Sequence, residues 1–175
     1  MRLQTTFIAF PLLVAATTAS TVDLVADFNS IKAQTVALNN SVNVFPATGG
    51  TLSQAFDINA MAGNLIATTI ITWGDIQDAP KPFTDSDANK LLTITEGLQP
   101  IIGDALEGVL AKKGAFDALN VTYLVKVDIN NLDTWTANLL IALGGFISAD
   151  ELPRVDLLKN ESVAAFAAAR AVYGL

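Results

Sequence analysis

The chain of 175 residues contains no cysteine and no histidine. Without cysteine there are no disulfide bonds, no thiolate nucleophile and no thiolate zinc site. Without histidine there is no serine–histidine or cysteine–histidine catalytic machinery and no imidazole ligand for a metal ion. The two absences favour a protein that binds other molecules over one that reacts with them, and we expect neither a metal nor a cofactor.

Positive charge is also scarce. The 10 lysines and arginines are outnumbered by 17 acidic residues, which gives a formal net charge of −7. Nucleic acids and anionic membrane surfaces are recognised through basic patches. The charge balance therefore argues against both as partners.

The acidic residues leave an enzyme formally open, because a pair of carboxylates can hydrolyse glycosides without histidine. These acids, however, fall mainly on polar helix faces or at helix starts, where solvation and capping explain them. Asp85 and Asp87, for example, lack the further oxygen ligands of a calcium loop and fit a helix cap better. We therefore expect no enzymatic activity.

Hydrophobic residues, in contrast, make up 51% of the chain. Arg2 precedes a short apolar run at residues 7–16 and small residues at 17–20, the pattern of a secretory signal peptide. No later stretch is long and apolar enough for a transmembrane segment. We predict a signal peptide over residues 1–20, one domain over residues 21–175, and a protein that is secreted, either extracellular or in a cell wall.

Apolar residues recur at helical spacing in five later segments, which cover residues 24–45, 52–76, 88–109, 121–143 and 152–173. No long segment alternates with a period of two, so the pattern predicts an all-α fold. We expect a single-domain bundle of about five amphipathic helices. The third would be kinked near Pro100, because its apolar periodicity resumes in register beyond the proline.

Several short motifs follow one another along the chain: LNNSVNVFPATGGTL at residues 38–52, then 86–88, 91–92, Leu98, Pro100, Leu106, 112–113 with Phe116, 125–128, and 164–166 with Tyr173. In this order they resemble the fungal hydrophobic surface binding protein A (HsbA) family, which includes cell-wall galactomannoproteins. The resemblance covers about residues 22–173. It departs from the family pattern at Asn59, where members often carry a histidine, and in lacking a Ser/Thr-rich tail.

The resemblance implies a secreted helical domain that adsorbs to hydrophobic surfaces or holds a lipid between its helices. Wall mannoproteins of this kind are similar to domains that sequester a fatty acid in a central tunnel. The physics is compatible, because a helix of about 20 residues is about 30 Å long and can flank an acyl chain along its length. The absence of a Ser/Thr-rich tail weakens covalent wall anchoring more than it weakens lipid binding.

Central apolar positions of the predicted helices are the candidates for the lining of such a tunnel: Phe28, Phe56, Leu65, Leu98, Leu124, Leu132, Leu139 and Phe166. Hydroxyls on or beside apolar faces are candidates for a lipid head group: Thr35, Thr69, Thr95 and Ser162. An apolar stripe is more often ordinary core, and such hydroxyls more often bond back to their own helix. The sequence alone does not separate a cavity wall from a packed interior.

Three sequons begin at Asn39, Asn120 and Asn160, so glycosylation is predicted at these asparagines. The sequence thus leaves two main hypotheses. The protein is either a carrier of a fatty acid or other lipid, or a protein that adsorbs to a hydrophobic solid surface. A structural cell-wall mannoprotein without a lipid ligand, associated with wall polysaccharide, is a further alternative.

Overall fold

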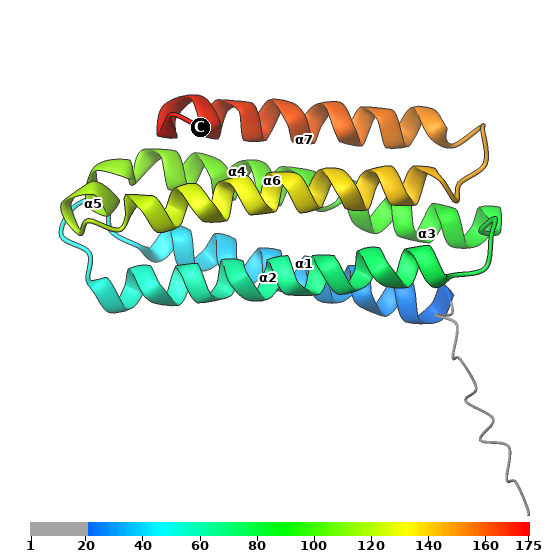
Figure 1. The fold of residues 1–175 in the computed structure, drawn as a ribbon, viewed down its shortest axis with the longest axis horizontal. Helices are drawn as coiled ribbons and strands as arrows, with labels where there is room; N and C mark the ends of the chain where they lie inside the picture. The colour runs from blue at the N-terminus through cyan, green and yellow to red at the C-terminus, as the bar shows by residue number, and fades with distance from the viewer. Residues whose placement is uncertain (1–20) are drawn as a thin grey trace, which may run out of the picture.

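The computed structural model describes residues 21–175 and shows an elongated bundle of helices (Figure 1). Across this range the chain forms seven α-helices and no strand, as predicted for an all-α fold. The predicted signal peptide lies outside the described residues. The helices are α1 (Thr21–Val44), α2 (Leu52–Asp78), α3 (Asp85–Glu96), α4 (Gln99–Ala111), α5 (Lys113–Ala118), α6 (Thr122–Gly144) and α7 (Leu152–Tyr173).

The long helices form a closed ring of five rod-like elements, here called staves. Four staves are the single helices α1, α2, α6 and α7, and the fifth is made of α3 followed by α4. Going round the ring, α1 packs on α2, α2 on α6, α6 on α7, α7 on α4 and α3, and these two on α1. Figure 1 shows these long elements running side by side along the long axis. A ring of five rods leaves more room on its axis than a four-helix bundle of the same rods.

The predicted kink near Pro100 is wrong in its position and its form. The chain leaves the helix after Glu96, turns at Gly97 and Leu98, and starts α4 at Gln99. Pro100 then stands in the first turn of α4, where its missing N–H removes no helical hydrogen bond. Inside one continuous helix its ring would clash with the carbonyl of Glu96, so the break comes before the proline.

The prediction of about five helices also missed α5. α4 ends at Ala111 with Lys112 as its C-cap, and the chain enters the six-residue α5 at once. Its Phe116 is buried and stacks on Phe45 at the end of α1, with 4.7 Å between ring centroids. At the opposite end of the bundle Phe83 packs against Phe146 at 5.2 Å. Aromatic pairs therefore close both ends of the ring.

Two helices, α2 and α3, begin with side-chain capping bonds. Thr51 and Gln54 form the capping box of α2, in which each side chain bonds the backbone N–H of the other residue. Thr84 caps α3 by accepting from the N–H of Asp87. The last helix, α7, starts at Leu152 without a side-chain cap and ends at Tyr173.

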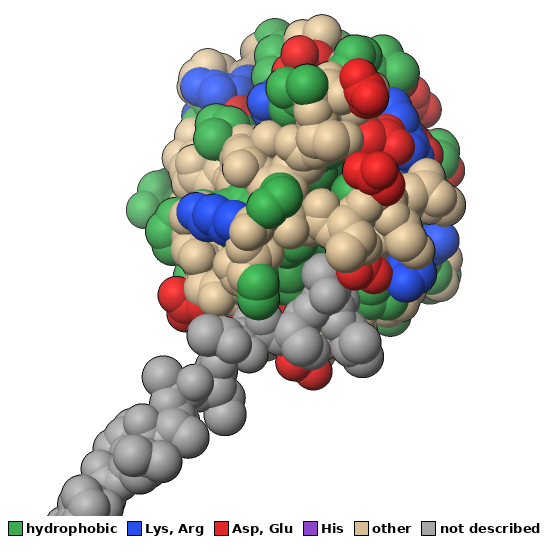
Figure 2. All heavy atoms as spheres, turned by 90° about the vertical axis from the view of Figure 1, so that its right-hand side faces the viewer, with side chains coloured by type: hydrophobic (Ala, Val, Ile, Leu, Met, Phe, Trp, Pro, Cys, Tyr) green, Lys and Arg blue, Asp and Glu red, His purple; other side chains and the backbone are tan. Residues whose placement is uncertain are grey.

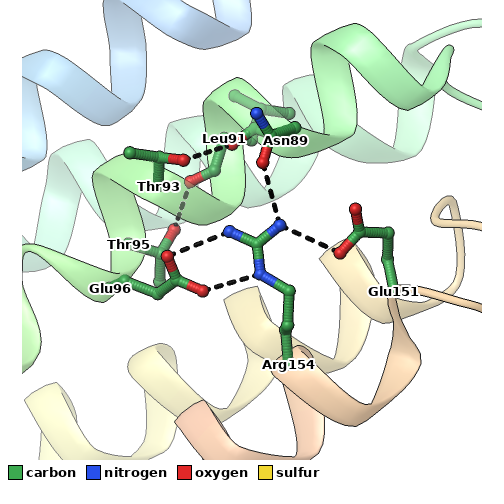
Figure 3. A network of polar contacts seen from close by, with 7 residues as sticks. All are labelled: Asn89, Leu91, Thr93, Thr95, Glu96, Glu151 and Arg154. Atoms are coloured by element: carbon green, nitrogen blue, oxygen red, sulfur yellow. Dashed lines mark hydrogen bonds and ion pairs between the residues drawn. The ribbon is translucent and has the colours of Figure 1, made fainter.

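Arg154 fastens α7 to α3 on the outside of the ring (Figure 3). Its guanidinium donates to both carboxylate oxygens of Glu96, at 2.7 and 2.9 Å, and to Asn89 and Glu151, each at 2.9 Å. The bidentate bond to Arg154 lowers the pKa of Glu96 below its ordinary value. Every charge of this cluster therefore faces an opposite charge or a hydrogen-bond partner.

The end of the bundle that carries the α2–α3 and α6–α7 connections is shown in Figure 2. Its hydrophobic side chains lie in small separate groups among polar ones, and several acidic side chains gather on one side. Within residues 21–175, no helix is long and apolar enough to cross a membrane.

Candidate ligand cavity

A cavity of about 110 Å³ lies on the axis of the ring and is lined by side chains from all five staves. On α1 the lining runs from Phe28 to Val42, which corresponds to about 21 Å at 1.5 Å per helical residue. The cavity is therefore long and narrow. Its wall is mainly aliphatic and aromatic, as in ordinary sites for apolar ligands.

The structure brings six of the eight predicted lining residues to this cavity: Phe28, Leu65, Leu98, Leu132, Leu139 and Phe166. Leu124 is partly buried and packs against the hydrophobic core without lining the cavity. Phe56 does not line it either, because 51% of its surface is exposed to solvent. Its assignment to the cavity is a misreading of which face of α2 points inward.

The inner face of α2 is made of smaller residues than the sequence pattern suggests. The buried positions follow strict helical spacing at Ala55, Ile58, Ala62, Leu65, Thr69, Thr72 and Ile76. Phe56 follows Ala55 by one residue, or about 100° of helix rotation, and so turns outward. Alanine and threonine on the inner face leave room on the axis, which a stripe of large residues would fill.

The predicted head-group hydroxyls lie in or beside the cavity, but three of them bond to their own helix. Thr35, Thr69 and Thr95 line the cavity, and each donates to the carbonyl four residues earlier, at 2.8 Å. A hydroxyl has a single proton, so these side chains can only accept from a ligand. Ser162 is buried outside the lining and bonds Gln99, which does line it, at 3.1 Å.

Asp128 on α6 is a cavity residue that the sequence reasoning missed. Its carboxylate lies in the mainly apolar wall and accepts a hydrogen bond from Asn59 Nδ2 on α2, at 2.8 Å. Burial raises the pKa of Asp128 from 3.8 to about 6, although the bond from Asn59 works in the opposite direction. Helical spacing was the available signal, because Asp128 stands three residues after Val125 and four before Leu132, which both line the cavity.

The three sequon asparagines lie at the surface. Asn120 and Asn160 are exposed, and Asn39 is partly exposed and accepts a hydrogen bond from Asn43. Glycosylation at these positions stays a prediction. In the part of the chain that the structure describes, no group of three or more acidic side chains is arranged to hold a metal ion.

Residues 21–143 match the model of a family described as hydrophobic surface binding protein A, in agreement with the resemblance drawn from the sequence. No curated protein matches the chain.

Among solved structures, the chain is similar to AFMP4P in complex with palmitic acid, with a TM-score of 0.82 and 25% identity over 87% of this chain and 99% of that one. It also shares the fold of ligand-binding domain 1 of the Penicillium marneffei MP1 protein, complexed with arachidonic acids, with a TM-score of 0.79 and 15% identity over 89% and 99% of the two chains. Domain 2 of the same protein, also in complex with arachidonic acids, gives a TM-score of 0.75 and 15% identity over 85% and 90%.

Proposed function

Because the chain belongs to the hydrophobic surface binding protein A family, we propose that it is a secreted, non-catalytic carrier that binds a fatty acid or a related lipid on the axis of its helical ring. The axial cavity is the observation that carries this proposal, since its wall is mainly apolar and runs for about 21 Å along α1. The similarity to AFMP4P, a palmitic acid complex, supports the same class of ligand.

Apolar burial supplies the affinity in this proposal. Each buried methylene contributes about 0.8 kcal/mol, so ten of them contribute about 8 kcal/mol before the costs of ordering the ligand. The cavity of about 110 Å³ is smaller than an engineered cavity of about 150 Å³ that holds benzene. A whole acyl chain therefore enters only if the staves move apart, and ligand binding should widen the ring.

Filling the cavity tests this proposal. Ala62 lies on the inner face of α2, and Ala67 lies exposed on the same helix. We expect Ala62→Leu to weaken dodecanoate binding at least about tenfold, because three added carbon atoms occupy the space of the ligand. Ala67→Leu adds the same atoms outside the cavity and should bind as the unchanged protein does.

Isothermal titration calorimetry on lipid-free protein measures these affinities, and native mass spectrometry of the secreted protein detects co-purified lipid. Saturable binding with one site, lost only in Ala62→Leu, supports the carrier. If neither dodecanoate nor an uncharged long-chain alcohol binds and no lipid co-purifies, the carrier proposal fails. Peptide sequencing of the secreted protein should find a mature N-terminus near residues 19–21.

Adsorption to hydrophobic solids is a second candidate function, favoured by exposed apolar side chains at one end of the bundle. The end of α1 and the starts of α2 and α6 meet there (Figure 1), and Val44, Leu52, Phe56 and Tyr123 are all exposed in these segments. Replacing Phe56 and Tyr123 with serine should reduce retention on hydrophobic beads, with hydrophilic beads as the control. Equal retention of both proteins would argue against this end as the adsorbing surface.

A further inference from the structure

Asp128 is the only charged side chain in the lining of the axial cavity within residues 21–175. Its carboxylate is held across the α2–α6 contact by the amide of Asn59, at 2.8 Å, so its position is fixed by a partner from the neighbouring stave. The lining contains neither lysine nor arginine in this part of the chain. A negative charge that enters the cavity thus meets a second negative charge and no cation.

The hydrogen-bonding capacity of the wall points in the same direction. Thr35, Thr69 and Thr95 have each committed their only hydroxyl proton to a backbone carbonyl. Gln99 is joined to Ser162, with its amide nitrogen donating to the serine oxygen. Toward a ligand, the three threonines and Asp128 therefore offer acceptors, which suit a ligand that donates a hydrogen bond and do not suit a carboxylate, which only accepts.

We propose that Asp128, positioned by Asn59, makes the cavity selective for alkyl ligands whose head group donates a hydrogen bond and carries no negative charge. A long-chain alcohol is the simplest ligand of this class, with its hydroxyl donating to a carboxylate oxygen of Asp128. A fatty acid enters in its protonated form more readily than as the carboxylate, because two carboxylates in an apolar site repel each other. The inference rests on the proposed function and specifies the head group of its ligand.

Decan-1-ol and decanoate test this selectivity, since they share one alkyl chain and differ in the head group. At pH 8 decanoate is ionised, and so is Asp128, whose pKa is about 6. We expect calorimetry to show decan-1-ol binding at least about tenfold more tightly than decanoate to the unchanged protein. Equal affinities, or tighter binding of decanoate, would overturn the proposal without any variant.

Asp128→Asn supplies the second measurement. The new amide keeps the shape of the side chain, can still accept from Asn59 and adds an N–H donor, so decanoate should bind about tenfold more tightly than before. Decan-1-ol should change less than about threefold, because a carbonyl oxygen remains to accept its hydroxyl. Asp104→Asn, which removes the same charge from an exposed position outside the lining, is the control and should leave both affinities unchanged.

The outcomes separate this inference from the function on which it rests. If dodecanoate, decanoate and decan-1-ol all fail to bind, the carrier function itself is wrong. If the alkyl ligands bind but Asp128→Asn and Asp104→Asn shift the ratio of the two decyl affinities equally, the carrier stands and the role of Asp128 is refuted. A shift confined to Asp128→Asn supports the head-group selectivity.

Discussion

Two carboxylates in this bundle have opposite surroundings. Glu96, on the outside of the α3–α7 contact, is gripped by both arms of the Arg154 guanidinium, and its pKa is lowered. Asp128, on the inside of the α2–α6 contact, has an amide as its partner, and burial raises its pKa to about 6. The surroundings of Glu96 stabilise its charged form, whereas those of Asp128 destabilise the charged form.

The difference separates a structural polar contact from a functional one. The Arg154 cluster joins two staves and needs no further partner (Figure 3). The partly buried charge of Asp128 beside the cavity lowers the stability of the fold at neutral pH. A role in ligand binding would explain why the chain carries this cost. A packing role alone would be served equally well by a neutral side chain, so we attribute Asp128 to ligand recognition, as proposed above.

Removing Arg154, which holds the α3–α7 cluster together, should have the largest effect on stability. We expect Arg154→Ala to lower the free energy of unfolding by about 2 kcal/mol at pH 7, because four hydrogen bonds are lost and Glu96 and Glu151 then lie near each other unpaired. Urea denaturation followed by circular dichroism measures the change. Ligand affinity should not move, since Arg154 is outside the axial lining.

A matched control is Arg170→Ala, which breaks one bond, to Asp133, at 2.8 Å. Exposed pairs of this kind contribute about 0–1 kcal/mol, so this variant should be the milder of the two. Equal losses in the two variants would show that the α3–α7 cluster is no stronger than an ordinary surface ion pair.

Neutralising Asp128 should have a smaller effect on the free energy of unfolding, and it should raise this free energy where Arg154→Ala lowers it. The pKa of Asp128 is raised in the folded protein, so the fold binds the proton more tightly than the unfolded chain does. The stability contributed by the protonated group is complete below about pH 4 and is lost as the pH rises through about 6. We expect Asp128→Asn to raise the free energy of unfolding by about 1 kcal/mol at pH 8, after allowance for solvent screening.

The same variant should gain nothing at pH 4, where the native carboxyl group is already protonated. Urea denaturation at pH 4, 6 and 8 therefore separates the charge from the shape of the side chain. A gain that is equal at all three values of pH would mean that packing, and not the buried charge, distinguishes Asp128.

Helical periodicity was sufficient to predict the long helical segments of this fold but not their junctions or the short α5. The 3.6-residue pattern identifies helices because it is a local signal. The break at Gly97–Leu98 was missed because the apolar stripe continues in register from α3 into α4. The short α5 was missed because six residues are too few to show a period.

The cavity was predictable to the extent that large residues define its wall. Phe28, Leu65 and Phe56 were all chosen as central apolar positions, but Phe56 faces solvent. The inner face of α2 is set by how the staves pack around the axis, which the spacing of one helix does not specify. The bond between Asn59 and Asp128 joins residues 69 positions apart, so no local pattern signals it.

The smallest expected effect on stability is that of neutralising Glu96, the carboxylate paired with Arg154. The pKa of Glu96 lies below its ordinary value of 4.5 in the folded protein, so its contribution to stability is present above about pH 4.5 and is lost as the pH falls below it. Glu96→Gln should therefore cost about 0.5 kcal/mol at pH 7, a value reduced by the exposure of the side chain, and less at pH 3. Denaturation at these two values of pH measures the difference.

Because Asp128→Asn gains stability at high pH while Glu96→Gln loses it, opposite signs in one experiment would establish that the two carboxylates differ in their surroundings. If both variants lost stability at pH 7–8, Asp128 would be a compensated group like Glu96, and the case for its role in ligand selection would fall with that contrast.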